Sequence, residues 1–429
     1  MYALSRTLVT AVLVGTSIHP AIASGIALRE GSADWSANAF AGESAKAYDA
    51  STAFSNPAGM TRLNWNETDL SFTVVAPSSN FSGANTIGGQ ITPGSEGGHY
   101  AQPFAIPSVF AVWNASPDFK FGIAITAPFG ARLAYSQDFV GRYQSVVSSL
   151  SDVQISLAGA YRINEHLSVG GGPVINFLSA RLTQAVNLGG LSSAFGDPMA
   201  DFSGSSVGAG FALGALYEFD DSLRVGIVYR SRIQPTVTGT QQVAFSPLIG
   251  VASPVIGAAL SASAGSASSR FSLPDSLSFG FYKQIDERWS VMADLQWTDW
   301  SLIDTLAIIP ANHAPATVLP ENWRNTWFGA LGASFRPITK LLLQAGIGYD
   351  LSPVTGNNRT TRIPDANRFL VGGGITYSLL ANVNVQFAVL EALSGAAKID
   401  NSASPTAGII RGTYHTQATT VSVGMTARF

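Results

Sequence analysis

Apolar and polar side chains alternate strictly at the carboxyl end of this chain. Ser, Gly, Thr and Arg side chains lie on one face of an extended strand, opposite Val421, Val423, Met425, Ala427 and Phe429. A strand has this period when one face meets an apolar medium and the other a polar one. A chain that ends on such a strand with a terminal aromatic residue is typical of an outer-membrane barrel, although a soluble sandwich can end in the same way.

The same period of two recurs along most of the chain and is clearest over 288–298, 341–350 and 382–389. About fourteen such segments begin near residues 68, 105, 119, 151, 166, 205, 222, 268, 288, 323, 340, 367, 382 and 414. Single-chain bacterial barrels have an even number of antiparallel strands, whose residues face lipid and lumen in turn. The pattern therefore predicts an all-β fold, a 14-stranded antiparallel transmembrane β-barrel over residues 67–429.

The connections between these segments are short and long in turn. The tight ones lie at 116–118, 164–165, 220–221, 286–287, 337–339 and 380–382. The long ones lie at 78–103, 129–150, 184–204, 240–267, 303–322, 352–366 and 395–413. Outer-membrane barrels have this asymmetry, with short periplasmic turns and long extracellular loops, and a soluble barrel has no reason to segregate them. Aromatic residues near strand ends are expected to form interfacial girdles, namely Tyr161, Tyr217, Tyr282, Trp289 and Trp300.

The amino-terminal segment predicts export from the cytoplasm. Arg6 precedes an apolar run over residues 8–18, and the small-residue site Ala21-Ile22-Ala23 follows it. The run is too short to cross a bilayer core of about 30 Å, so residues 1–23 are predicted to be a secretory signal peptide. No later apolar stretch is long enough to span a bilayer as a helix. We therefore expect a multi-pass barrel in the outer membrane of a Gram-negative bacterium.

Composition agrees with a lipid-facing barrel and excludes several other classes. Charged residues make up only 12% of the chain, which contains 43 Gly, 24 Phe, 12 Tyr and 8 Trp. The absence of Cys excludes disulfide scaffolds and thiol-ligated metal sites. A net charge of −3 without a basic cluster argues against nucleic acid as a partner. The few histidines stand in no nucleophile or metal-ligand motif, so we predict neither an enzyme nor a cofactor.

The segment before the first strand, residues 24–66, lacks alternation and is rich in Ala, Ser and Gly. A segment of this length is either a disordered periplasmic leader or an internal plug of short helices and turns. A fourteen-stranded barrel encloses a lumen too wide for its own side chains to fill, which a plug would occupy. Composition alone fits both alternatives equally well.

Short motifs along the chain resemble those of one known family, in the right order. They are Ala41-Gly42-Glu43, Asn56-Pro57-Ala58-Gly59-Met60-Thr61-Arg62, Ala127-Pro128-Phe129-Gly130, Gly141-Arg142-Tyr143, Leu273-Pro274-Asp275, Trp297-Thr298-Asp299-Trp300, Tyr349-Asp350-Leu351-Ser352-Pro353-Val354 and Arg362-Ile363-Pro364-Asp365-Ala366-Asn367-Arg368-Phe369. Together they resemble the FadL/TodX family of outer-membrane transporters for long-chain fatty acids and aromatic hydrocarbons. The resemblance is specific for the family but not for the substrate.

This resemblance implies a monomeric barrel of fourteen strands whose lumen is plugged by an N-terminal helical hatch, residues 24–66. In the family, ligand is caught between long extracellular loops, moves to a site in the lumen and leaves sideways through a gap in the wall. The resemblance therefore implies a capture surface, a lumen site for the ligand and a lateral opening beside the hatch.

The residues predict the lateral opening near Ala127. Pro128 cannot donate an N–H to the ladder and Gly130 permits a bend, so Pro128, Phe129 and Gly130 are expected to form a kink that opens the wall. The alternative is that the strand simply ends there. The resemblance places the hatch motif Asn56-Pro57-Ala58 beside this kink, where it would act as a gate and satisfy the freed backbone groups.

Two of the long loops, 184–204 and 240–267, are unusually apolar for segments exposed to water. Exposed apolar surface usually marks a binding site, so we predict that these loops catch a hydrophobic ligand. Packing of the loops on each other as a cap is the alternative, and one surface can do both. The predicted capture residues are Leu188, Leu191, Phe195, Phe245, Leu248, Ile249, Val255, Ile256 and Leu260.

Two arginines are candidates for binding the head group of a fatty acid. Strand phase predicts that Arg324 faces the lumen while Trp323 and Trp327 face lipid, and the resemblance places it where family members keep a basic residue. Arg181 falls near a second such position, but its lumen orientation requires a bulge near residues 177–178. The alternative for both is pairing with carboxylates of the plug.

These features predict outer-membrane uptake of hydrophobic compounds, with long-chain fatty acids as the expected substrate. Aromatic hydrocarbons are the first alternative, and a general diffusion porin is less favoured because it needs neither plug nor apolar loops. An adhesin or phage-receptor role would be secondary. The expected partners are outer-membrane lipid, a hydrophobic small molecule and the barrel-assembly machinery. This machinery would recognise the terminal strand, which ends in Phe429.

Overall fold

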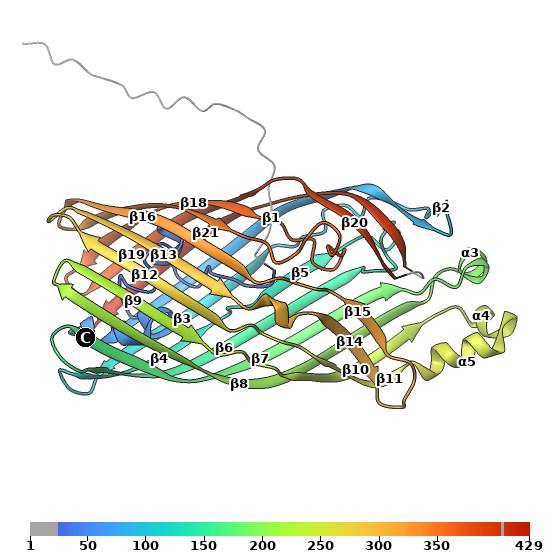
Figure 1. The fold of residues 1–429 in the computed structure, drawn as a ribbon, viewed down its shortest axis with the longest axis horizontal. Helices are drawn as coiled ribbons and strands as arrows, with labels where there is room; N and C mark the ends of the chain where they lie inside the picture. Colours follow the sequence, from blue (N-terminus) through green and yellow to red (C-terminus); the bar gives the residue numbers. More distant parts are fainter. Residues whose placement is uncertain (1–24, 405–406) are drawn as a thin grey trace, which may run out of the picture.

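The computed structural model describes residues 25–404 and 407–429, so the predicted signal peptide lies outside the described residues. Fourteen antiparallel wall strands form one barrel, which closes through pairing of the first strand with the last (Figure 1). The wall strands, six of them interrupted, are β1 (Glu67–Ile87), β3 (Phe104–Asn114), β4 (Phe119–Thr126) with β5 (Gly130–Ala134), β6 (Val147–Arg162), β7 (Leu167–Ala185), β8 (Met199–Asp220), β9 (Leu223–Arg230) with β10 (Thr236–Ala244), β11 (Gly265–Arg270) with β12 (Ser276–Gln284), β13 (Trp289–Thr298) with β14 (Thr305–Pro310), β15 (Thr317–Pro320) with β16 (Thr326–Ile338), β17 (Leu341–Asp350), β18 (Arg368–Leu380), β19 (Val383–Ser394) with β20 (Ala397–Ser404), and β21 (Gly408–Arg428). The predicted barrel and its strand count are confirmed.

Alternation of side chains determines which face of each strand meets lipid. In β21, Val421, Val423 and Met425 are exposed on the outside, while Ser422 and Thr426 are buried on the inside. Apolar side chains thus point outward and polar ones inward, the reverse of a soluble barrel. No helix among residues 25–404 and 407–429 is long and apolar enough to cross a membrane.

The two ends of the barrel differ as predicted. All tight turns lie at one end, together with the carboxyl terminus, and α3 (Gly190–Phe195), α4 (Pro247–Ala252) and α5 (Pro254–Ala262) lie at the other (Figure 1). The predicted long loops are more ordered than expected, because paired strands continue into most of them. For example, β14 and β15 form a hairpin within 303–322, and β1 continues to Ile87 before the short strand β2 (Gln90–Ile91).

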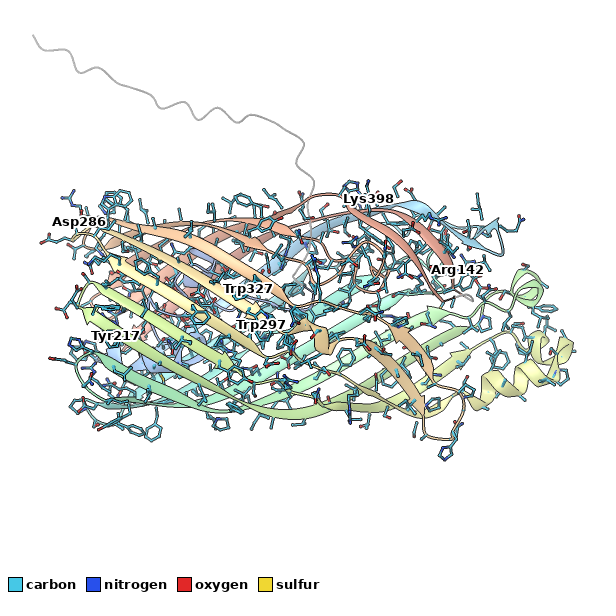
Figure 2. The ribbon with its side chains drawn as sticks, in the orientation of Figure 1. Arg142, Tyr217, Asp286, Trp297, Trp327 and Lys398 are labelled. Atoms are coloured by element: carbon cyan, nitrogen blue, oxygen red, sulfur yellow. The ribbon has the colours of Figure 1, made fainter. Side chains whose placement is uncertain are left out.

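The outer face carries only part of the predicted aromatic girdle. Tyr161, Tyr217 and Trp289 are exposed on the outside, whereas Tyr282 and Trp300 are buried inside the barrel. The prediction for these two residues is wrong, because an aromatic residue at a strand end can pack inside the barrel as well as lie at the membrane interface. Figure 2 shows Tyr217 near the short-turn end and Trp297 beside Trp327, its partner across β13 and β16.

The N-terminal segment lies inside the barrel and not beside it. Its helices are α1 (Ala33–Ala37), α2 (Thr52–Ser55) and the 3₁₀ helix η1 (Pro57–Arg62), which contact the inner faces of wall strands from β1 to β21. A capping side chain stabilises the start of α1 and of η1: Ser32 Oγ accepts from the N–H of Asp34 at 3.2 Å, and Asn56 Oδ1 accepts from that of Ala58 at 3.1 Å.

Buried charges and glycines fix this segment against the wall. Lys46 Nζ lies 2.6 Å from a carboxylate oxygen of Asp34, whose other oxygen accepts from Gln344 on β17 at 2.8 Å. Pairing of this kind is required for charges held away from water. On β18, a Cβ added at Gly372 would lie 2.3 Å from the carbonyl oxygen of Ser36, so only glycine lets the helix approach this closely.

Candidate functional site

A gap opens in the wall between β3 and the interrupted strand β4–β5. The last β3–β4 pair is Val109 with Ile125, and β4 ends at Thr126. Beyond this point, Phe104–Ser108 of β3 still pair with β1, but within the described chain they have no ladder partner on the other side. The strand resumes as β5, which pairs with β6 and is joined to the chain before β3 by a bridge between Ala101 and Leu133. The kink predicted at Ala127–Gly130 therefore interrupts the wall.

The freed backbone of this kink pairs with the start of the N-terminal segment. Ala27 and Phe129 form an antiparallel bridge, with Leu28 donating to the carbonyl of Pro128 and Gly130 donating to that of Ile26, both at 2.8 Å. An added Cβ at Gly130 would lie 2.8 Å from Leu28 Cδ1, so a larger residue there would displace the Leu28 side chain.

The predicted partner of the kink was wrong. The motif Asn56-Pro57-Ala58 lies against β7, β8 and β9, where Asn56 Nδ2 donates to the carbonyls of Ser44 at 2.7 Å and Ala215 at 3.1 Å. The backbone of Pro57 and Ala58 approaches Gly170 on β7. Residues nearer the amino terminus reach the kink instead, because the motif begins the helix η1 and is anchored on β7, β8 and β9.

Outside the gap lies a hollow of about 580 Å³, lined by β3, the kink, β5 and β6. Leu28 and Phe129 line this hollow and also a second cavity on the inner side, which extends to Phe54, Ile233 and Leu273. The two side chains therefore separate the inner cavity from the outer hollow.

The inner side of the gap borders an apolar chamber in the upper half of the barrel. Trp300 packs against Phe129 and Trp323, with ring centroids 6.4 Å and 5.3 Å away. The other buried apolar residues of this cluster include Ile26, Leu150, Leu178, Leu182, Phe202, Val237, Leu306 and Ile308. Such a surface suits a ligand that is itself apolar.

Neither arginine predicted to bind a head group faces this chamber. Trp323 is buried and points inward, whereas Arg324 is exposed and donates to the carbonyl of Ser352 at 3.4 Å. The strand phase fails there because β16 begins only at Thr326, after a turn in which Asn322 has a φ of 47°.

Arg181 also lies on the outside. Alternation runs through β7 without the expected bulge, which leaves Arg181 on the face of Ile175 and Phe177. Its guanidinium pairs with Asp201 on β8 at 2.6 Å. Both head-group assignments are therefore corrected by the structure.

A different arginine lines the chamber. Arg362, in the loop between β17 and β18, is 3% exposed and borders an apolar pocket with Leu306, Ile303 and Trp323. Desolvation by burial lowers the pKa of Arg362 to about 10. This arginine lies within one of the family motifs, but its role could not be predicted, because a loop residue has no strand phase that indicates its direction.

The loop of Arg362 also anchors the N-terminal segment. A carboxylate oxygen of Asp365 accepts from the N–H of Gly25 at 2.9 Å and from Ser352 Oγ at 2.6 Å. Burial raises the pKa of Asp365 to about 7, against the opposing effect of Arg368. The contact thus links the first residue that the structure describes to a buried titratable group.

The predicted capture residues gather at the loop end of the barrel. Helices α4 and α5 pack against each other where Gly250 meets Gly257, and Ile249 and Leu260 are buried in this region. Leu248 and Val255 are 55% and 80% exposed, as is their neighbour Val251 at 78%. Leu188, Leu191, Phe195, Phe245 and Ile256 are partly buried. The loops therefore pack on each other and still present an apolar surface to solvent.

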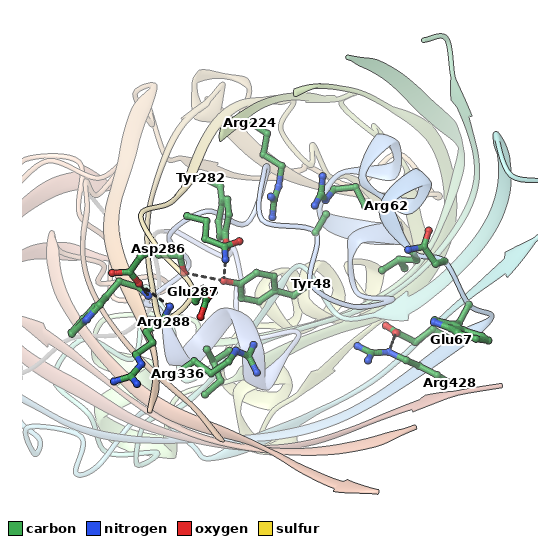
Figure 3. A pocket seen from close by; sticks show the side chains of 18 residues that line it. Tyr48, Arg62, Glu67, Arg224, Tyr282, Asp286, Glu287, Arg288, Arg336 and Arg428 are labelled. Carbon is green, nitrogen blue, oxygen red and sulfur yellow. Dashed lines mark hydrogen bonds and ion pairs between the residues drawn. The ribbon is translucent and has the colours of Figure 1, made fainter. Parts of the chain in front are cut away.

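The short-turn end of the barrel has the opposite character. A cavity of about 390 Å³ lies below the N-terminal segment and is lined by five arginines and three acids (Figure 3). Arg428 pairs with Glu67 at 2.7 Å, and the guanidinium of Arg224 lies 3.8 Å from the ring centre of Tyr282. Tyr48 from the N-terminal segment bonds to the hydroxyls of Tyr282 and Ser290, each at 3.2 Å. An apolar molecule finds no favourable surface here.

The chain is similar in sequence and in fold to known proteins. Residues 12–429 match the family described as outer membrane protein transport protein (OMPP1/FadL/TodX). The long-chain fatty acid transport protein of Escherichia coli O157:H7 is 25% identical over 404 residues, covering 88% of this chain and 90% of the relative. A FadL homologue from Pseudomonas aeruginosa superimposes with a TM-score of 0.88 at 21% identity, covering 94% of this chain and all of that one. The Pseudomonas putida toluene transporter TodX gives 0.68 at 18% identity, with 95% and 100% coverage. The chain belongs to the OMPP1/FadL/TodX family, and is a non-enzymatic outer-membrane β-barrel that transports hydrophobic compounds in a Gram-negative bacterium.

Proposed function

We propose that this protein takes up long-chain fatty acids, which are captured at the loop end, held in the apolar chamber and released sideways through the gap beside β3. The observation that carries the proposal is the gap itself, which lies next to an apolar chamber and opens onto an outer hollow. The name of the relative from Escherichia coli supports fatty acids as the substrate.

The two ends of the barrel support a sideways route. An apolar ligand that continued along the axis would have to pass Lys46, Asp34 and then the arginine-lined cavity at the short-turn end. Desolvation of such groups without compensation is costly. A ligand that left through the gap would stay in contact with apolar side chains until it reached lipid.

In this proposal residues 24–66 act as a hatch, and its first residues act as the gate. Within the described residues, the two backbone hydrogen bonds of the bridge join Ile26–Leu28 to the kink, whereas the following residues are anchored by buried ion pairs and helices. Local opening requires little free energy where few contacts must break. We therefore assign gating to Ile26–Leu28 and a fixed, sealing role to the rest of the hatch.

Uptake measurements test the proposal. Cells that carry or lack the gene are given labelled oleate or labelled toluene, and the expected result is faster oleate uptake only in cells that carry it. Purified protein in planar bilayers should show little steady conductance. Uptake of toluene alone would favour the aromatic alternative, and a large, steady conductance would indicate a diffusion porin.

A further inference from the structure

The guanidinium of Arg362 has an unused donor in an apolar pocket. Its Nη2 donates to the carbonyl of Gln144 and, at 2.7 Å, to Gln184 Oε1. Its buried Nη1 bonds to no acceptor within residues 25–404 and 407–429. A buried charged donor without a partner is costly, so the arrangement is complete only when something else supplies an acceptor.

The pocket that Arg362 lines combines an apolar wall with a net positive charge. Ile26, Leu150, Leu182, Leu306 and Trp323 are among the residues of its apolar wall. Its charged members are Arg270, Arg362 and Glu321, which are two guanidinium groups and one carboxylate. Glu321 is buried and accepts only long hydrogen bonds of 3.4 Å, from Trp323 Nε1 and Thr360 Oγ1. One added carboxylate would neutralise this pocket.

We propose that Arg362 binds the carboxylate of a single-chain fatty acid through Nη1, while the chain of the acid lies on the apolar wall toward Trp323. This inference rests on the proposed function and names the residue that selects acids over neutral hydrocarbons. A hydrocarbon without a head group leaves Nη1 without a partner. Discrimination by a buried polar group that is left unpaired is typically strong.

Glu321 makes the proposal more specific. Its carboxylate competes with the ligand for the positive charge of Arg362 and repels the incoming acid. Neutralising Glu321 should therefore tighten oleate binding, whereas a purely structural disturbance of the pocket would weaken it. The two positions are thus expected to act in opposite directions.

Binding of oleate and of 1-octadecene, a chain of the same length without an acceptor, is measured on the purified full-length barrel. Arg362→Gln should weaken oleate binding roughly tenfold or more and leave 1-octadecene unchanged, as expected for loss of a charge-assisted hydrogen bond. Arg362→Lys should retain part of the preference for oleate, and Glu321→Gln should strengthen it. The exposed Arg324→Gln is the matched control and should change neither ligand. Heat-dependent migration in gels verifies that each variant is folded.

Equal loss of both ligands in folded Arg362→Gln, or unchanged oleate binding, would overturn the role of Arg362 and leave hydrophobic transport standing. Weaker oleate binding in Glu321→Gln would also overturn it. If the unmodified protein bound neither ligand, the proposed function would fail together with this inference.

Discussion

Ala27 and Phe129 face each other as an antiparallel bridge, and this pair joins the first residues of the hatch to the kink of the interrupted wall strand. The hydrogen bonds lie on either side of the pair, from Leu28 to Pro128 and from Gly130 to Ile26. Phe129 also contacts Trp300 in the apolar chamber and lines the outer hollow. The bridge therefore closes the boundary between the chamber and the lipid side of the gap.

Straightening the kink should stop uptake without unfolding the barrel. Replacing Ala127-Pro128-Phe129-Gly130 with Thr-Val-Thr-Val supplies the missing N–H and extends β4 along β3, which closes the gap. We expect oleate uptake to fall to the level of cells without the protein. The variant Phe129→Leu keeps the kink and an apolar side chain and should retain most of the uptake. Normal uptake by a folded, straightened barrel would exclude the gap as the exit.

Displacing the hatch should make the barrel leak. Valine at Gly372 must collide with the carbonyl of Ser36, since even a Cβ there would lie 2.3 Å from it. Overpacking of this kind costs about 1–3 kcal/mol of stability. We expect this cost to weaken the contacts between hatch and wall and to leave the pairing of the wall strands intact. Single-channel recordings should show new conductance. Gly373→Val is the matched control, because a Cβ at Gly373 lies 3.9 Å from its nearest neighbour; equal conductance in both variants would contradict a sealing hatch.

Removing apolar surface from the loop end should weaken capture. Changing Leu248, Val251 and Val255 to Ser leaves the buried contact of α4 with α5 intact and removes exposed side chains. We expect initial oleate uptake at low concentration to fall about threefold to tenfold, since each such side chain contributes at most a few kcal/mol when covered. Ile91→Ser, an exposed apolar residue in β2 at the same end, is the control. An equal effect of both would show a general change in the loops instead of a capture surface.

The contact of Gly25 with Asp365 should strengthen as the pH rises. Burial raises the pKa of Asp365 from an ordinary value of 3.8 to about 7, whereas the hydrogen bond from the N–H of Gly25 is among the contacts that lower it. This hydrogen bond therefore favours the ionised carboxylate, and by linkage the contact becomes stronger as the pH rises through about 7. Hydrogen exchange of residues 25–31, corrected for its intrinsic pH dependence, should show more protection at pH 8 than at pH 6. Asp365→Asn should abolish this difference, and protection that decreases with pH would contradict the assignment.

Much of the fold was predictable because each wall strand separates two media. The starts predicted near residues 119, 222 and 340 fall within one residue of β4, β9 and β17. The tight turns were equally predictable, because the connections at the periplasmic end of an outer-membrane barrel are short. The loop end was predicted less well, because strands that rise above the membrane no longer meet lipid and lose their alternation. Residues 305–320 are an example: they pair as β14 and β15 within a segment that was predicted to be a long loop.

The site was less predictable, because its geometry depends on breaks in the strands. The kink could be predicted from Pro128, which has a local effect on the ladder. The direction of Arg324 could not, because phase is lost across the turn before Thr326, and Arg181 was assigned a bulge that the strand does not have. The partner of the kink is a long-range contact of Ala27 with Phe129, which no local pattern encodes.

Cross-linking the bridge tests the exit route most directly. The chain has no Cys, so Ala27→Cys with Phe129→Cys provides only one possible intramolecular disulfide. The two residues form a non-hydrogen-bonded pair, whose Cα atoms are typically about 4.5 Å apart and within reach of a disulfide. Oleate uptake is measured in cells before and after reduction, with each single Cys variant as a control. We predict that uptake is lost in the oxidised double variant and returns on reduction, while the single variants are unaffected. Undiminished uptake through a fully oxidised bridge would contradict lateral exit at this gap.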